Sequence, residues 1–262
     1  MTSIWKLDRH ADVATLTIDN PPVNALSQAA LAELHRHLEA LASSVDAPVV
    51  RAVIITGTGE KAFVAGANIK EINALADASA GSTFGMAALE LARLMRRLPF
   101  PIIAAINGVA YGGGCELALM CDMRIASQSA RLALPEITLG LMPGWGGSVR
   151  VARQAGASTA LMMALTGDPI GAEDALRLGL VDRVVPASEL LPTAQALASR
   201  IASMSSPVVA TIKATIWAGV DQPLDAALTA ECDTFAAVVV GADAKEGTAA
   251  FLGKRAPVWS DR

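Results

Sequence analysis

The sequence is poor in cysteine, histidine and aromatic residues. Of 262 residues, three are cysteine, three are histidine and 4% are aromatic. Cys115, Cys121 and Cys232 match no metal-ligand spacing, and an odd number does not suit a disulfide framework. His35 and His37 lie two positions apart, on different faces of a predicted helix, whereas two-histidine sites need a spacing of four. We therefore expect no metal site.

The chain also lacks any basic run and any uninterrupted apolar span. The net charge is −4 and no Lys/Arg run reaches three residues, so we expect no nucleic-acid partner. The N-terminus has no continuous apolar segment typical of a signal peptide, and the most apolar window, 98–121, is broken by prolines, glycines, Asn107 and Glu116. These features predict a cytoplasmic, soluble protein with no membrane partner.

What is abundant is apolar sequence. Apolar residues make up 53% of the chain and charged residues 18%, which leaves little charged surface for a monomer. We interpret this as a sign of buried subunit interfaces. The alternative is an alanine-rich monomer, because folded monomers also expose apolar area.

Hydrophobic periodicity predicts a strand-rich core at 1–187 and a helical region at 188–262, which is an α/β fold. Residues 61–72 are interpreted as a turn before a short helix, and 74–86 as a mobile loop with a helix beginning near 83. Ser206-Pro207 and Gln222-Pro223 are typical helix starts. The predicted strands are 3–9, 12–18, 51–56, 102–106, 123–126, 131–134 and 181–185, and the predicted helices before 188 are 28–44, 83–98, one after 112, 148–155, 158–165 and 171–180.

The most informative stretch is 102–121, where an apolar strand leads through Gly112-Gly113-Gly114 into a predicted helix. Successive glycines let a ligand approach the peptide N–H groups closely. Glu116 follows in the first helical turn, where the helix dipole favours an ionised carboxylate. The stretch predicts donors for an oxyanion with a charged base beside them.

A second glutamate, Glu136, lies in the apolar segment 132–141. Burial there would disfavour its charge and leave it able to donate a proton. Two carboxyl groups whose pKa values are pushed in opposite directions form an acid/base pair, so Glu116 and Glu136 are the candidate catalytic residues. The alternative is one helix-capping and one ion-paired surface glutamate, since sequence alone does not place the two together.

The chain resembles the enoyl-CoA hydratase/isomerase (crotonase) superfamily from about residue 4 to 259. The resemblance implies a spiral of ββα units, a C-terminal helical region for trimerisation and active-site cover, and often a dimer of trimers. It also implies an acyl-CoA substrate and no cofactor besides the coenzyme A of that substrate. The motifs that carry it are 20–26 (NPPVNAL), 62–71 (AFVAGANIKE), 105–116 (AINGVAYGGGCE), 135–136 (PE), 143–147 (PGWGG) and 251–257 (FLGKRAP).

The resemblance also assigns roles to residues. The glutamate matching Glu116 activates water for attack at C3, and the one matching Glu136 supplies the C2 proton. Trp145 either lines the acyl pocket or packs outward. Asn68 stands where many relatives have Asp, and Gly253 where many have Glu. The implied backbone and binding residues are Ala67 and Gly113 for the oxyanion hole, Gly144 for the water, and Ala65, Ala67, Asn68, Ile69, Lys70 and Gly113 for CoA or substrate.

Two other functions stay open at this stage. A Δ3,Δ2-enoyl-CoA isomerase, or another thioester-enolate enzyme of the superfamily, generally needs only one acid/base, so the presence of both glutamates favours the hydratase. Some relatives bind RNA through a lysine-rich first helix, but here 28–44 contains no lysine. The glycine run does not have the Gly-x-Gly-x-x-Gly spacing of nicotinamide sites.

Overall fold

The computed structural model describes residues 3–43 and 49–260, in which the strands form two sheets. One sheet has the order β1-β2-β3-β5-β7-β10 and the other β4-β6-β8-β9. The strands are β1 (Trp5–His10), β2 (Val13–Ile18), β3 (Ala52–Gly57), β4 (Ala62–Val64), β5 (Ile102–Ile106), β6 (Val109–Tyr111), β7 (Met123–Ser127), β8 (Arg131–Ala133), β9 (Ile170–Gly171) and β10 (Arg183–Val185).

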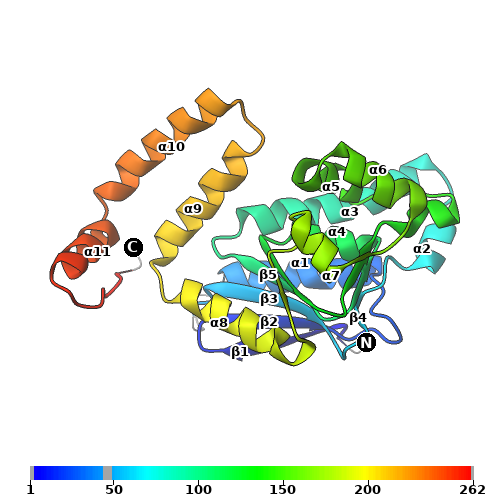
Figure 1. The fold of residues 1–262 in the computed structure, drawn as a ribbon, viewed down its shortest axis with the longest axis horizontal. Coiled ribbons are helices and arrows are strands. Elements are labelled where there is room, and N and C mark those ends of the chain that lie inside the picture. The colour runs from blue at the N-terminus through cyan, green and yellow to red at the C-terminus, as the bar shows by residue number, and fades with distance from the viewer. Residues whose placement is uncertain (1–2, 44–48, 261–262) are drawn as a thin grey trace.

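Helices connect the strands and make up the C-terminal part of the chain (Figure 1). They are α1 (Gln28–Ser43), α2 (Ile69–Asn73), α3 (Ala78–Arg97), α4 (Gly113–Met120), η1 (Pro135–Leu139), α5 (Gly147–Ala155), α6 (Ala157–Thr166), α7 (Ala172–Arg177), η2 (Ala187–Glu189), α8 (Leu190–Ala202), α9 (Ser206–Gly219), α10 (Leu224–Val239) and α11 (Ala242–Leu252).

From β3 onward the chain adds one strand to each sheet and then forms a helix. β3 and β4 are followed by α2 and α3, β5 and β6 by α4, and β7 and β8 by η1 and α5. β3, β5 and β7 pair in parallel, as do β4, β6 and β8, while β1–β2 and β8–β9 are antiparallel. This repeat confirms the predicted spiral of ββα units.

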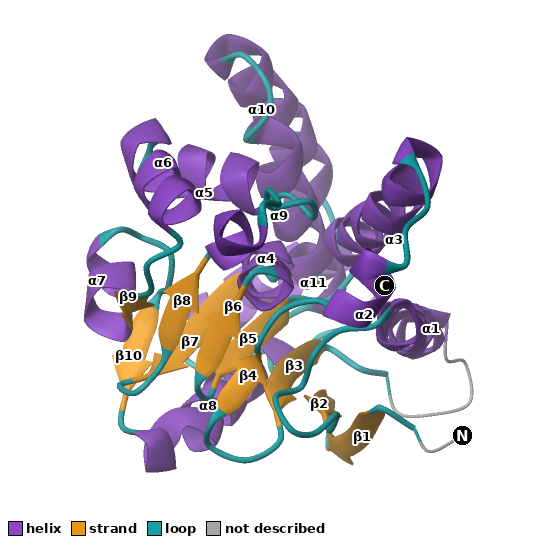
Figure 2. Ribbon diagram, turned by 90° about the vertical axis from the view of Figure 1, so that its right-hand side faces the viewer, coloured by secondary structure: helices purple, strands orange, loops and turns teal. Residues whose placement is uncertain are grey.

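Both faces of the larger sheet are covered, which explains why its central strands are apolar runs. On one face lies the main core, beneath α1, α3 and α4; on the other, α8 packs Leu190, Ala194 and Ala198 against the sheet (Figure 2). The predicted inner face of α1 is confirmed, since Leu31, Leu34, Leu38 and Leu41 are all buried. Residue 44, the expected end of that helix, lies outside the described residues.

Three predictions near the second sheet are wrong. The helix expected to begin near residue 83 begins at Ala78, where Asp77 caps α3 by accepting a hydrogen bond from the Ala80 N–H (2.9 Å). The stretch 61–72 contains β4 before its short helix, and β6 separates the strand β5 from the glycine run. Strands of three residues are too short to show a period, so the sequence pattern missed them.

The C-terminal helices α9, α10 and α11 extend away from the two sheets (Figure 1). α9 and α10 begin at the predicted Pro207 and Pro223 positions. α8 belongs to the predicted helical region yet packs on the sheet, so the division at residue 187 stays a prediction. No helix in the described part of the chain is both long and apolar enough to cross a membrane.

A buried ion pair fixes α9 to the core. Lys213 Nζ lies 2.8 Å from Asp122 Oδ2 and also donates to the carbonyl oxygens of Met95 (2.8 Å) and Phe100 (2.9 Å). Asp122 accepts further bonds from the Trp217 indole N–H (2.6 Å) and from the backbone N–H that starts β5 (2.7 Å). Burial lowers the pKa of Lys213, and the carboxylate of Asp122 opposes that shift.

Asp122→Ala should lower the free energy of unfolding by about 3–5 kcal/mol, because it leaves a buried ammonium without its counter-charge. The Lys213 side chain is only 7% exposed. The matched control is Lys6→Ala: Lys6 pairs with Asp19 but is 60% exposed, so its loss should cost less than about 1 kcal/mol. Denaturant unfolding at one protein concentration measures the free energy of unfolding of both variants. Equal losses would contradict the stabilising role of the buried Asp122–Lys213 pair.

Candidate active site

A cavity of about 370 Å³ lies where two glycine-rich turns, at 112–114 and 144–147, meet α2 and α3. Its walls are mostly apolar, and the carboxyl groups of Glu116 and Glu136 both face it. A mainly apolar pocket with a few converging polar groups is the usual form of a small-molecule site. The structure thus brings together the two glutamates, which the sequence alone could not place side by side.

Glu116 is held by the second glycine-rich turn rather than by its own helix. It lies in the first turn of α4 and is 2% exposed. Its Oε1 atom accepts hydrogen bonds from the backbone N–H groups of Trp145 (2.7 Å) and Gly147 (2.8 Å). These two bonds fix one carboxylate oxygen and tie the turn at 144–147 to the turn at 112–114.

Burial dominates the electrostatics of Glu116. Desolvation raises the pKa of Glu116 to about 7, although the hydrogen bonds from Gly147 and Trp145 lower it; the nearby Glu136 carboxylate raises it further. The expectation that the helix N-terminus keeps this group fully ionised is therefore wrong. A dipole contribution of at most about 2 kcal/mol is smaller than the cost of removing a carboxylate from water.

Glu136 lies in η1, directly after β8, and faces the glycine run. Its Oε2 atom is buried and has no hydrogen-bond partner among the described residues, and a Cβ atom at Gly112 would lie 3.0 Å from its Oε1. Burial raises the pKa of Glu136, in the predicted direction. Both pKa values are thus raised, and the predicted opposite shifts are wrong. A buried oxygen without a partner is costly, which suits a group that meets a ligand.

The two predicted donor residues of the oxyanion hole lie next to each other. A Cβ atom at Gly113 would lie 3.4 Å from the Ala67 nitrogen and would overlap the ring of Trp145, so only glycine fits there. The Ala67 segment is held by Leu26, whose N–H donates to the Gly66 carbonyl (2.9 Å) and whose carbonyl accepts from the Asn68 N–H (2.7 Å).

Trp145 forms a wall of the pocket and does not pack outward. Its side chain is 6% exposed and stacks on Phe84 of α3, with ring centroids 5.5 Å apart and an interplanar angle of 28°. Phe84 falls within the predicted helix 83–98, but the sequence pattern gives no sign that it faces the pocket. The Asp77 cap before Ala78-Ser79-Ala80 was the signal that identifies this helix.

The remaining predicted residues divide between the pocket and its rim. Ala65, Ile69 and Gly144 line the cavity, whereas Lys70 is exposed beside it. Asn68 caps α2 by accepting from the Lys70 N–H (3.1 Å), so the amide performs the capping that an aspartate would. Gly253 ends α11. In the described residues no cluster of three or more His, Cys, Asp or Glu side chains is placed to hold a metal ion.

The spiral of ββα units and the paired carboxyl groups beside a glycine-rich turn define a class of acyl-CoA enzymes, and comparison with known proteins agrees. The enoyl-CoA hydratase/isomerase family model matches residues 8–262, and the chain belongs to this family.

The chain is 40% identical over 250 residues to a crotonyl-CoA hydratase of Syntrophomonas wolfei, which covers 95% of both chains. It is also 40% identical to a short-chain-enoyl-CoA hydratase of Clostridium acetobutylicum, over 95% of this chain and 94% of that protein. The crystal structure of an enoyl-CoA hydratase from Bacillus anthracis superposes with a TM-score of 0.92 at 36% identity, covering 99% of this chain and all of the other.

Proposed function

We propose that the protein is an enoyl-CoA hydratase, which adds water across the 2,3 double bond of a trans-2-enoyl-CoA to give a 3-hydroxyacyl-CoA. The observation that carries this proposal is the placement of Glu116 and Glu136 on one pocket, beside the paired backbone of Ala67 and Gly113. The identity to relatives named crotonyl-CoA and short-chain-enoyl-CoA hydratase supports it.

In this proposal the backbone N–H groups of Ala67 and Gly113 bind the thioester carbonyl oxygen. Attack of water at C3 moves negative charge onto that oxygen, and each fixed donor aimed at it contributes about 3 kcal/mol. The donors need no reorganisation during the reaction, because Leu26 holds one segment and the start of α4 holds the other.

Glu116 acts as the base and Glu136 as the acid. The N–H groups of Trp145 and Gly147 occupy Oε1 of Glu116, which leaves Oε2 to take a proton from the water that attacks C3; the Gly144 N–H helps to hold that water. Glu136, whose pKa is raised by burial, is the proposed donor of the proton to C2. A pKa of about 7 makes Glu116 a stronger base than an ordinary carboxylate while leaving much of it ionised near neutrality.

The coenzyme A portion of the substrate would run along residues 65–70, with Ala65, Asn68 and Ile69 beside it and Lys70 near its phosphates. The acyl chain would meet the stacked rings of Trp145 and Phe84, which close the apolar end of the cavity. No cofactor besides the substrate's own coenzyme A is required by this chemistry.

We further propose a homotrimer, or a dimer of trimers, assembled through the C-terminal helices. The large apolar side chains of α10 and α11 face solvent in the single chain: Phe235 is 66% exposed, Phe251 83% and Leu252 81%. Such an unburied apolar surface is typical of a subunit interface. Light scattering should give three or six times the 26.9 kDa chain mass, and a monomer at micromolar concentration would contradict the assembly.

The direct test of function is loss of enoyl absorbance with crotonyl-CoA and longer enoyl-CoAs. The wild-type protein should hydrate at least one chain length, and Glu116→Gln and Glu136→Gln should each lower kcat by about 10²–10⁴ with little change in KM, because each removes a proton transfer of the transition state. Glu173→Gln, on an exposed position of α7, is the control. No turnover on any chain length refutes the function; turnover of 3-enoyl-CoA alone identifies an isomerase instead.

The raised pKa of Glu116 predicts the acid limb of the pH profile. The base must be ionised, so kcat/KM should fall about tenfold per unit as the pH drops below about 7. Because the carboxyl groups of Glu116 and Glu136 interact, the apparent pKa of the acid limb is a property of the two groups together. The limb should disappear from the residual activity of Glu116→Gln. A profile that is flat from pH 5 to 8 would contradict a base of this pKa.

A further inference from the structure

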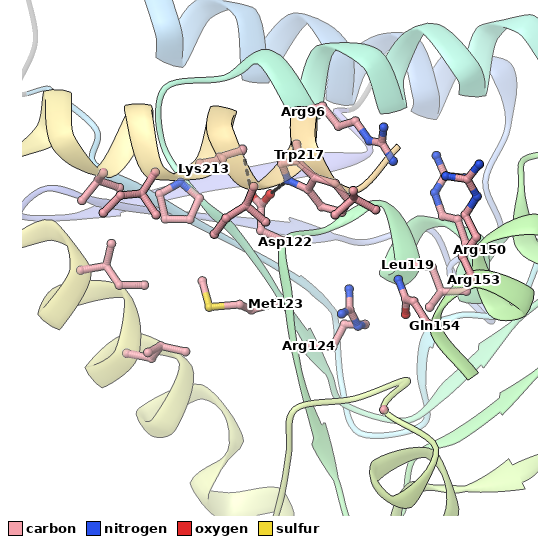
Figure 3. A pocket seen from close by; sticks show the side chains of 18 of the residues that line it. Arg96, Leu119, Asp122, Met123, Arg124, Arg150, Arg153, Gln154, Lys213 and Trp217 are labelled. Carbon is pink, nitrogen blue, oxygen red and sulfur yellow. Dashed lines mark hydrogen bonds and ion pairs between the residues drawn. The ribbon is translucent and has the colours of Figure 1, made fainter. Parts of the chain in front are cut away.

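A second cavity, of about 750 Å³, lies between the core and α9 and is lined by several basic side chains (Figure 3). Arg150 of α5 lines this cavity and does not line the substrate pocket. The proposed reaction gives it no part, although its helix starts at the turn that binds Glu116. Hydrogen bonds through Trp145 connect Arg150 to Glu116.

The guanidinium of Arg150 lies against the second glycine-rich turn. Its Nη1 donates to the Trp145 carbonyl oxygen (2.9 Å), and its own backbone N–H donates to the Gly146 carbonyl oxygen (2.9 Å). Gly146 has a φ of +101°, and a Cβ atom there would overlap Arg150 Nη1. Glycine is needed both for the backbone conformation and for the close approach of the arginine.

Trp145 connects this arginine to the base. Its carbonyl oxygen accepts from Arg150, while its N–H donates to Glu116 Oε1 at 2.7 Å. The Gly147 N–H makes the second bond to the same oxygen. Arg150 therefore holds in place the turn whose two N–H groups fix the orientation of the Glu116 carboxylate. It does so from the second cavity and not from the substrate pocket.

The charge of Arg150 also reaches Glu116. The positive charge lowers the pKa of Glu116, opposing the larger effect of burial. The pKa of Arg150 is itself lowered by burial and by the facing Arg96, and Glu116 opposes this shift. Other cations line the same cavity. Arg96 and Arg153 pair with Asp221 after α9, Arg124 pairs with Asp182 and Lys213 with Asp122, so these charges are partly neutralised, while Arg200 lies on α8.

Arg96 is held by a ring contact and an ion pair of its own. Its guanidinium lies over the Trp217 ring, 4.5 Å from the centroid, and 3.2 Å from Asp221. Glu136, across the substrate pocket, is the other carboxyl group that acts on Glu116.

We propose that Arg150 is a positioning residue of the hydratase site, which holds the 145–147 turn on Glu116 and favours the ionised form of that carboxylate. This inference rests on the proposed function in that Glu116 is taken as the base. It assigns a catalytic consequence to a residue that meets neither substrate nor coenzyme.

The test compares Arg150→Met, Arg150→Gln and Arg150→Lys. Removing the charge should raise the pKa of Glu116 by about one unit, since an opposite charge nearby lowers a carboxyl pKa by roughly 1–3 units. For the Met and Gln variants the acid limb of kcat/KM should move up by about one pH unit, with about tenfold loss at pH 6 and a smaller loss at pH 9. The Gln variant keeps a donor for the Trp145 carbonyl. It therefore shows the effect of removing the positive charge even if the Met variant does not fold. The lysine variant should restore the limb to within a few tenths of a unit.

Arg153→Met is the matched control, because Arg153 lies on the same helix and lines the same cavity but pairs with Asp221. Its acid limb should stay at the wild-type pH. An unmoved limb in both the Met and Gln variants, an equal shift in Arg150→Lys, or an equal shift in Arg153→Met would each overturn the proposal.

A direct titration separates this inference from the proposed function. Carbon-13 NMR of glutamate-labelled protein, with the Glu116 signal assigned by its loss in Glu116→Gln, follows the carboxyl group without substrate. A higher Glu116 pKa in Arg150→Gln than in the wild type supports the role of Arg150 even if enoyl-CoA is not turned over. Identical titrations refute it even if hydration is observed.

Discussion

The site depends on one buried interaction, in which Oε1 of Glu116 accepts hydrogen bonds from the backbone N–H groups of Trp145 and Gly147. These bonds join two glycine-rich turns that are separated by about thirty residues along the chain. They compensate part of the cost of burying a carboxylate, and they leave its other oxygen toward the pocket. If the turns moved apart, the glutamate would lose its partners and the pocket would lose a wall.

The two sheets explain why the turns meet. Because β4, β6 and β8 run in parallel, the segments that follow them leave from the same edge. Those segments carry the Ala67 turn, the glycine run before Glu116, and Glu136. The larger sheet supplies the rigid support, and the buried pair of Asp122 and Lys213 attaches the C-terminal helices to it. Rigid elements thus place groups that must lie within fractions of an ångström.

Long elements and chemically distinctive residues were predictable from the sequence. The leucines of α1 repeat over about three turns, and β3 and β5 are largely apolar runs, so each pattern has enough residues to show its period. β4, β6 and β8 have three residues each; β4 and β6 were missed for that reason. Phe84 lies in the predicted helix 83–98, but no local pattern shows that its ring stacks on Trp145.

The sequence by itself determined the long strands and helices and the two glycine-rich turns, and it indicated Glu116 and Glu136 as candidate catalytic residues, because these follow from residue type and spacing. Only the tertiary structure decided that both glutamates have raised pKa values, that Trp145 faces the pocket, and that Arg150 donates to the carbonyl of Trp145, whose N–H binds Glu116. The physical reason is that desolvation and charge pairing depend on neighbours distant in the chain, which no local pattern contains.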